Sequence, residues 1–172
     1  MTTLYHGSPF CVEHPLVGAG RPNLDFGPGF YLTNLKEQAE NWAVIISSRS
    51  KEPSPQAWLN TYHFDLDAAL TEGYRLLTLE TYDRRWLEFI AASRHGLQPW
   101  ADYDLIEGGV ANDKVVDAIE AYLSGMADLE RTLGKLAYAK PNHQLCLRSQ
   151  SLIDRHLHPA GSHLIEEGGA HA

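Results

Sequence analysis

Residues 23–33 read Asn-Leu-Asp-Phe-Gly-Pro-Gly-Phe-Tyr-Leu-Thr, and the rest of the chain is best interpreted outward from this segment. Its glycines and proline predict irregular backbone. The interleaved Phe26, Phe30 and Tyr31 argue against disorder, because aromatic residues favour burial. Two interpretations stay open. The aromatic residues form a platform on which a flat heteroaromatic ring stacks, or Phe26 and Phe30 fill the core while Tyr31 forms a hydrogen bond at a strand edge.

Regular elements are predicted on both sides of this segment. Residues 3–5 form a short apolar strand that stops at His6-Gly7-Ser8-Pro9. A helix is predicted over residues 35–48, with Asn34 as its N-cap and Glu37 completing a capping box. Apolar residues recur in this helix at helical spacing. They predict a buried stripe of Leu35, Ala39, Trp42, Ala43 and Ile46.

The remaining sequence mixes strand and helix patterns. Strands are predicted at residues 58–66, 74–79, 103–110 and 143–148. Helices are predicted at residues 82–93, after an Asn112 cap, after Asp128 and after Ser149. Because strands and helices do not alternate regularly, the expected fold class is α+β. We expect one domain over residues 1–165, followed by a mobile polar tail at residues 166–172.

Composition narrows the class of protein. The chain has 172 residues, 44% of them hydrophobic, and a net charge of −8, as expected for one acidic globular domain. The charge argues against passive coating of nucleic acid or anionic membrane. The start lacks a signal-peptide pattern, and no apolar run approaches the roughly 20 residues that span a bilayer, so no membrane partner is expected. Two cysteines make no disulfide framework; we expect a cytoplasmic protein with Cys146 buried as a small hydrophobe.

Several short motifs lack the context that their chemistry requires. Asp25-Phe26-Gly27 matches a kinase tripeptide, but the chain is too short for a kinase and lacks the accompanying motifs. Gly18-Ala19-Gly20 lacks the strand and helix of a dinucleotide fingerprint. The histidines near the end have no convincing ligand spacing, so we expect a solvated tail and no metal site there. They are His156, His158 and His163.

Two further pieces place polar groups beside apolar strands. In Tyr5-His6-Gly7-Ser8, the histidine can donate or accept hydrogen bonds, and the glycine lets a ligand approach the backbone. In Asn142-His143-Gln144-Leu145-Cys146-Leu147, the amide of Gln144 can donate and accept at once, which suits a ribose diol. Structural interpretations stay open for both pieces: an ordinary strand end for His6-Gly7, and a ladder-edge glutamine for Gln144.

Together and in this order, these pieces resemble the ADP-ribosyltransferase superfamily in its diphtheria-toxin-like His-Tyr-Glu branch. The chain looks closest to a bacterial family of uncharacterised domains attached to that superfamily. The matching segments span nearly the whole chain. They are Leu4 to Ser8, Asn23 to Thr33, Gln38-Ala39 with Trp42-Ala43, Tyr103 to Lys114 and Lys140 to Leu147.

The resemblance implies a split antiparallel β-sheet that binds NAD in the cleft between its halves. It implies that His6 contacts the adenosine-side ribose, that the Gly7 backbone holds the nicotinamide amide, and that Tyr31 stacks on the nicotinamide ring. By order along the chain, the third catalytic position falls on Gln144. The further NAD-contacting residues that the resemblance implies are Ser8, Asn23, Asp25, Phe26, Gly29, Asn112 and Asp113.

The third position departs from the superfamily pattern, which has Glu where this chain has Gln144. A glutamate orients the ribose hydroxyl and stabilises the developing cation, whereas a glutamine keeps the hydrogen bonds and supplies no charge. Three options stay open: another carboxylate substitutes, the domain only binds NAD, or glutamine suffices. Asp25 and Asp113 are the candidate carboxylates, although Asp113 also suits a plain helix start.

The resemblance also implies a function. A mono-ADP-ribosyltransferase would move ADP-ribose from NAD to an acceptor and release nicotinamide. The resemblance to this bacterial family suggests a toxin that is one half of a toxin–antitoxin pair, so a small antitoxin is an expected partner. The acceptor stays open between protein and nucleic acid. Two alternatives stay open as well: a non-catalytic module that binds NAD or ADP-ribose, and an NAD glycohydrolase.

Overall fold

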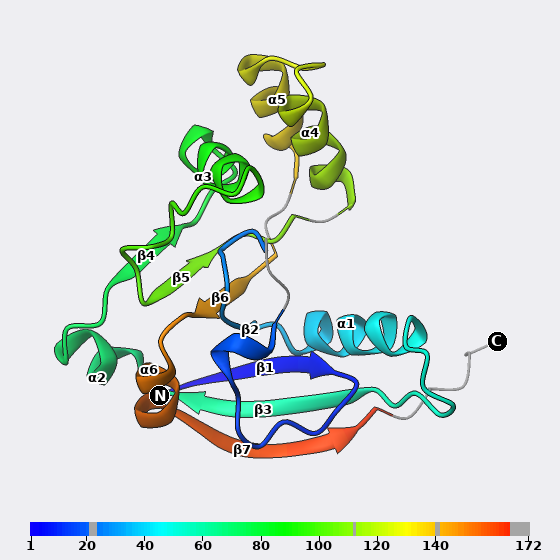
Figure 1. The fold of residues 1–172 in the computed structure, drawn as a ribbon, viewed down its shortest axis with the longest axis vertical. Coiled ribbons are helices and arrows are strands. Elements are labelled where there is room, and N and C mark those ends of the chain that lie inside the picture. Colours follow the sequence, from blue (N-terminus) through cyan, green and yellow to red (C-terminus); the bar gives the residue numbers. More distant parts are fainter. Residues whose placement is uncertain (21–23, 112, 140–141, 166–172) are drawn as a thin grey trace.

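The computed structural model describes residues 1–20, 24–111, 113–139 and 142–165, with the backbone alone for Asp113 and Lys114 (Figure 1). Two β-sheets lie one above the other in this view, and helices flank them. The predicted α+β class is confirmed. Three predictions fall outside the described residues: the mobile tail at 166–172, the NAD contact at Asn23, and the helix cap and NAD contact at Asn112.

The lower sheet in Figure 1, called sheet A, has three antiparallel strands in the order β1-β3-β7. They are β1 (Thr2–Ser8), β3 (Trp58–Phe64) and β7 (Leu157–Leu164). The buried Asn60 ties the loop after β1 to this sheet. Its Oδ1 accepts from the Val12 amide at 2.8 Å, and its Nδ2 donates to the Phe10 carbonyl at 3.1 Å. Because these bonds satisfy a buried amide, they fix the path of residues 10–12.

The upper sheet, called sheet B, has four strands in the order β2-β6-β5-β4. They are β2 (Phe30–Leu32), β6 (Gln144–Leu147), β5 (Leu105–Gly108) and β4 (Leu76–Leu79). The expectation of an antiparallel sheet is wrong at one edge, where β4 and β5 run parallel. Helix α3 (Arg84–Arg94) lies in the connection between these two strands and carries the chain back to the same end of the sheet. A crossover of this kind makes its two strands parallel.

Sheet B separates two apolar cores. One face packs Phe30, Leu105 and Leu147 against Leu4 and Tyr62 of sheet A. The other face packs apolar side chains that include Cys146 against helices α3, α4 (Asp113–Leu123) and α5 (Leu129–Leu136). The predicted burial of Cys146 is confirmed. That burial raises the pKa of its thiol to about 12, so the thiol stays protonated at neutral pH.

Helix caps decide where several helices begin. Asp128 caps α5 and Ser149 caps α6 (Gln150–His156), as the sequence predicts. A short 3-10 helix (Val17–Ala19) and α2 (Leu66–Thr71) were not predicted. The capping box predicted for α1 (Lys36–Ser48) is wrong, because the cap position is Leu35 and no side chain caps the helix there. Among the described residues, no helix has the length and apolar character needed to cross a membrane.

The predicted buried stripe of α1 is only partly correct. Ala39 and Ala43 are buried against β1, whereas Leu35 and Trp42 are each 45% exposed. The cause is a close backbone contact with Gly7 on β1. A Cβ atom built on Gly7 would lie 2.0 Å from the Ala39 carbonyl oxygen and 2.8 Å from the Ala43 nitrogen. At this separation the helix turns its small residues toward the sheet and its large apolar residues outward.

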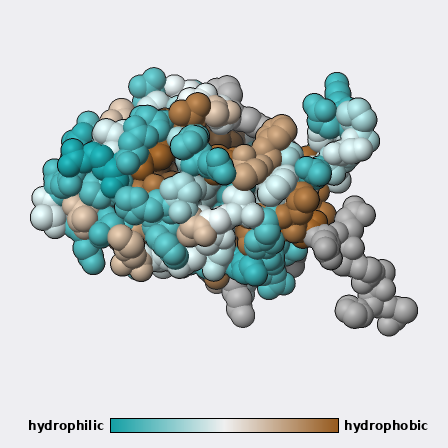
Figure 2. Space-filling view, turned by 90° about the horizontal axis from the view of Figure 1, so that it is seen from below, coloured by the Kyte–Doolittle hydropathy of each residue, from teal (hydrophilic) through white to brown (hydrophobic). Residues whose placement is uncertain are grey.

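The expectation of a solvated tail around the histidines near the end is wrong, because residues 157–164 form strand β7, which the sequence pattern does not predict. The strand pairs with β3 from Phe64↔Leu157 to Trp58↔Leu164 and forms the edge of sheet A. It contains Pro159 and Gly161, which mask the strand pattern in the sequence. Most of its residues are exposed, and the face seen from below is largely hydrophilic (Figure 2).

Replacing Gly7 with alanine should force α1 away from β1, because the added methyl group meets helix backbone. We expect Gly7→Ala to lower the free energy of unfolding by about 1–3 kcal/mol, the usual cost of overpacking. Urea denaturation measures this change. Gly18→Ala is the matched control, since a Cβ at Gly18 has nothing within 4 Å. Equal stability of Gly7→Ala and Gly18→Ala would contradict this account of the helix position.

Candidate functional site

The two sheets meet through one pair of backbone hydrogen bonds. The Tyr5 amide donates to the Thr33 carbonyl at 2.8 Å, and the Thr33 amide donates to the Tyr5 carbonyl at 2.9 Å. Backbone groups of alternate residues in a strand point to the same side. The amide and carbonyl of Gly7 therefore point away from β3, and those of Tyr31 point away from β6. We call the region between β1 and β2 beyond this bridge the seam.

His6 lies at the seam with a defined protonation state. Its Nδ1 lies 2.7 Å from the Tyr31 carbonyl oxygen, and its ring lies 4.4 Å from the Phe30 ring centroid. A carbonyl oxygen only accepts, so Nδ1 carries the proton and donates. Burial lowers the pKa of His6, which keeps the ring neutral. Among the described residues, Nε2 has no hydrogen-bond partner. Its lone pair is therefore free to accept from a ligand.

Tyr31 holds the glycine-rich loop in place. Its hydroxyl donates to the Gly27 carbonyl at 2.7 Å and accepts from the Phe26 amide at 3.1 Å. Burial raises the pKa of Tyr31 well above its ordinary value, so the hydroxyl stays protonated. The side chain is half-buried. Because the hydroxyl is committed to the loop, Tyr31 can offer a ligand its aromatic ring but not an acid or base.

The loop itself is built by close contacts. Gly27 has φ of +79°, and a Cβ built on it would lie 2.7 Å from the Trp100 ring. A Cβ on Gly29 would lie 2.5 Å from Cys146 Sγ. Arg148 adds a hydrogen bond from Nε to the Pro28 carbonyl at 3.2 Å. Both glycines therefore have a packing role, whatever else the loop binds.

Two of the expected NAD contacts have clear structural roles. The Phe26 side chain is fully buried in the core, which leaves no face of its ring for a ligand. The core-filling interpretation therefore holds for Phe26, and also for the buried Phe30. Ser8 is buried, and its hydroxyl accepts from the Phe10 amide at 3.1 Å. That bond stabilises the turn that leaves β1.

Of the two candidate carboxylates, the structure describes the side chain of Asp25 and only the backbone of Asp113. Asp25 pairs with Arg94 of α3, with Oδ1 3.0 Å from both Nε and Nη2. The two side chains are only 18% and 23% exposed, so this pair is partly shielded from solvent. Asp25 is therefore committed to holding α3 against the loop. Asp113 begins α4, and its side chain lies outside the described part of the structure.

Gln144 is the first residue of β6 and lies on the same face of sheet B as Tyr31. This follows from the register, because Tyr31 pairs with Cys146 and alternate residues share a face. The Gln144 Nε2 donates to the Gly109 carbonyl at 3.3 Å, which also accepts from Trp86 Nε1 at 3.2 Å. Its Oε1 has no partner among the described residues. The side chain is half-buried, so this oxygen can accept from a ligand.

A polar cluster next to Gln144 was missed in the sequence. His143 Nδ1 accepts from the Asn34 amide at 3.0 Å, so Nε2 carries the proton and donates to Glu107 at 2.8 Å. With both ring nitrogens used, His143 cannot act as a general base. Gln38 bonds both backbone groups of the same residue. Each residue lies in or beside a matching segment, but the separations along the chain, up to 109 positions, hide the contacts.

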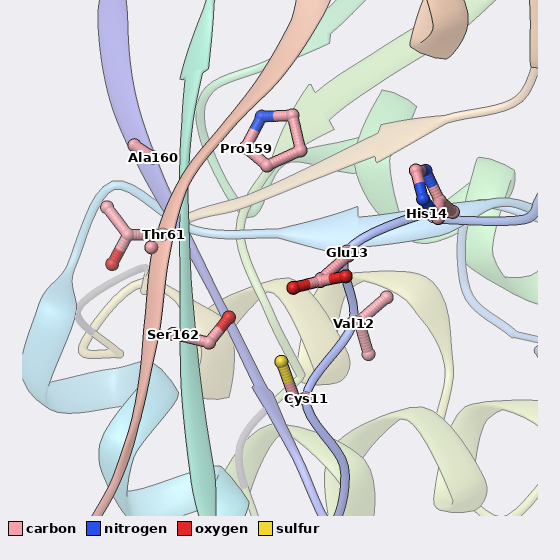
Figure 3. Close-up of a pocket in the computed structure, with 9 residues that line it drawn as sticks. Cys11, Val12, Glu13, His14, Thr61, Pro159, Ala160 and Ser162 are labelled. Carbon is pink, nitrogen blue, oxygen red and sulfur yellow. The ribbon is translucent and has the colours of Figure 1, made fainter.

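The described cavities lie away from the seam. One of about 460 Å³ opens between residues 11–14 and strand β7 (Figure 3). Its lining includes Cys11, Glu13, His14 and Ser162, none of which was predicted to bind NAD. In the residues that the structure describes, no group of three or more His, Cys, Asp or Glu side chains is placed to hold a metal ion.

Comparison with protein families places most of the chain in a family. A family model described as "Protein of unknown function (DUF3990)" matches residues 2–158. No curated protein and no solved structure matches the chain. The family match covers all of sheet B, strands β1 and β3 of sheet A, the seam and every helix described above, and it ends at the second residue of β7. The chain therefore belongs to the DUF3990 family of proteins of unknown function.

Proposed function

We propose that this chain is an NAD-dependent mono-ADP-ribosyltransferase that binds NAD at the seam. One observation supports the proposal: three segments far apart in the sequence lie on the neighbouring strands β1, β2 and β6. His6 of β1 bonds the Tyr31 carbonyl of β2 at 2.7 Å, and Tyr31 pairs with Cys146, two residues from Gln144 on β6. These are the three positions that the resemblance to ADP-ribosyltransferases singles out, in its order.

The chemistry of the seam fits the polar parts of NAD. A nicotinamide carboxamide has one acceptor oxygen and one donor NH₂ group, and the Gly7 amide and carbonyl offer the complementary pair. Nε2 of neutral His6 has no partner in the described part of the chain and can accept a hydrogen bond from a ribose hydroxyl. The half-buried ring of Tyr31 can stack on nicotinamide. Each of these groups is oriented by the fold before any ligand arrives, which lowers the entropic cost of binding.

The reaction breaks the C–N bond between nicotinamide and ribose C1′. The bonding electron pair leaves with nicotinamide, the acceptor's nucleophilic atom bonds to C1′, and the acceptor's proton passes to water. Positive charge develops on the ribose in the transition state, so a hydrogen-bond acceptor aimed at its hydroxyls is stabilising. Gln144 Oε1 supplies this acceptor without a formal charge. The proposal extends to a toxin role in the cytoplasm, with a protein or nucleic-acid acceptor and a small antitoxin partner.

A second candidate function is a module that binds NAD or ADP-ribose without chemistry. It is favoured by Gln144, which is neutral, and by Asp25, whose carboxylate is paired with Arg94 at 3.0 Å. Binding needs the hydrogen bonds of the seam, whereas rapid transfer needs charge stabilisation as well. An NAD glycohydrolase would use the same site with water as acceptor.

Labelled NAD distinguishes these functions. A transferase releases nicotinamide and labels a macromolecule in a host lysate, and digestion with protease or nuclease then identifies the acceptor class. A glycohydrolase releases nicotinamide and leaves no label on macromolecules. A binding module gives saturable heat by calorimetry with no nicotinamide release. Absence of NAD binding, of ADP-ribose binding and of nicotinamide release would contradict all three.

Removing the His6 ring should weaken NAD binding, because one oriented acceptor is lost. We expect His6→Ala to raise the Kd for NAD by about tenfold, the equivalent of one hydrogen bond of about 1.4 kcal/mol. Titration calorimetry measures this change, and circular dichroism checks the fold. His158→Ala is the matched control, because His158 is an exposed histidine on β7. Identical affinity in both variants would show that His6 does not contact NAD.

The protonation state of His6 predicts a dependence on pH. Because burial lowers the folded-state pKa of His6, the ring stays neutral as the pH falls through its ordinary value of 6.5. NAD affinity should therefore stay constant through that value and fall only at more acidic pH, when Nε2 gains a proton. Calorimetric titrations of wild type and His6→Ala across this range provide the measurement, and an affinity that already drops above pH 6.5 would contradict it.

The free energy of unfolding should also decrease at acidic pH. The unfolded chain binds the His6 proton at a higher pH than the folded chain does, so unfolding becomes easier as the pH falls below 6.5.

A further inference from the structure

Gln38 of helix α1 forms a pair of hydrogen bonds with the backbone at the start of β6. Its Nε2 donates to the His143 carbonyl at 2.8 Å, and its Oε1 accepts from the His143 amide at 3.3 Å. One side-chain amide thus satisfies both backbone groups of one residue. A neighbouring β-strand would normally do this.

The sheet register shows why residue 143 needs such a partner. The ladder between β2 and β6 ends at the pair Leu32↔Leu145. Because alternate residues point to the same side, the backbone groups of His143 also face the side of β2, where the strand has already ended. The backbone of Gln144 faces β5 instead and pairs with Gly108. Gln38 therefore takes the place of the missing strand neighbour.

The His143 side chain is held as firmly as its backbone. Nε2 donates to Glu107 at 2.8 Å, and Nδ1 accepts from the Asn34 amide at 3.0 Å. Four hydrogen bonds therefore fix the residue immediately before Gln144. With His143 on one face of sheet B, Gln144 must point to the other face, which it shares with Tyr31.

Helix α1 also contacts the other side of the seam. The residue after Gln38 is Ala39, whose carbonyl oxygen would lie 2.0 Å from a Cβ on Gly7. One turn of helix therefore touches both Gly7 on β1 and His143, the residue just before β6. Since a helix turn is a rigid unit, it sets the separation between the Gly7 backbone and Gln144.

We propose that Gln38 is a positioning residue for the transfer reaction: it holds Gln144 at a fixed distance from the Gly7 backbone. The inference rests on the proposed function, because it assumes that the Gly7 backbone and Gln144 both contact NAD. Gln38 does not touch NAD in this account. It acts through His143, so its loss should misplace the acceptor for the ribose hydroxyl while leaving the seam itself in place.

Gln38→Ala should lower kcat for nicotinamide release by about 10- to 100-fold, because a displacement of about 1 Å in a catalytic group costs this much. KM for NAD should change less than about threefold, since His6, Gly7 and Tyr31 are unaltered. Gln38→Glu keeps an acceptor for the His143 amide but places a carboxylate against the His143 carbonyl, so kcat should fall as well. Asn41→Ala is the matched control, because Asn41 is an exposed residue of the same helix.

The experiment measures kcat and KM for nicotinamide release from NAD by wild type, the two Gln38 variants and Asn41→Ala. Thermal unfolding of each protein runs in parallel. A lower kcat in folded Gln38→Ala or Gln38→Glu, with KM and Asn41→Ala unchanged, supports the proposal. If one variant does not fold, the other supplies the comparison, and failure of both to fold would show a structural role and overturn the proposal.

Two results would overturn the proposal in distinguishable ways. If wild type releases nicotinamide and both Gln38 variants keep wild-type kcat, Gln38 is not a positioning residue and the proposed function stands. The same holds if the variants only unfold at lower temperature while kcat of the folded protein is unchanged. If wild type releases no nicotinamide, the proposed transferase function fails first, and the role of Gln38 fails with it.

Discussion

Two hydrogen bonds between Tyr5 and Thr33 join the two sheets, and the rest of the site depends on them. They fix which backbone groups of β1 and β2 turn toward the seam, because direction alternates along a strand. The Tyr31 carbonyl consequently faces His6, and the Gly7 amide and carbonyl point away from β3, toward the side of β1 on which β2 lies. Helix α1 can then pack closely on Gly7, since no side chain intervenes.

The polar groups around the seam are mostly committed to one another. The Tyr31 hydroxyl holds the glycine-rich loop, Asp25 holds Arg94, and His143 is bonded at both ring nitrogens. Among the described side chains predicted to contact NAD, Nε2 of His6 and Oε1 of Gln144 have no hydrogen-bond partner, and both are neutral. These two groups can therefore bind a ligand through hydrogen bonds in fixed directions, and they can stabilise a cation only as oriented dipoles. This is why the proposed transferase and the NAD-binding module share one geometry and differ in the strength of charge stabilisation.

Part of this arrangement could be predicted from the sequence, because it depends on local rules. The caps at Asp128 and Ser149 and the burial of Cys146 follow from residue type and spacing. The outward Trp42 could not be predicted, since it results from contact between α1 and Gly7, 35 positions away. Gln38 and Glu107 were missed for the same reason: their shared partner His143, just before β6, is distant along the chain. Strand β7 could not be predicted because Pro159 and Gly161 interrupt the strand pattern in the sequence.

A crystal structure of the chain grown with NAD would test the proposed site most directly. We expect nicotinamide in the seam, with its carboxamide hydrogen-bonded to the Gly7 amide and carbonyl and its ring against Tyr31. We also expect a ribose hydroxyl within about 3 Å of His6 Nε2, the usual hydrogen-bond distance. NAD bound in the cavity beside Cys11 and β7, with the seam empty, would contradict the account.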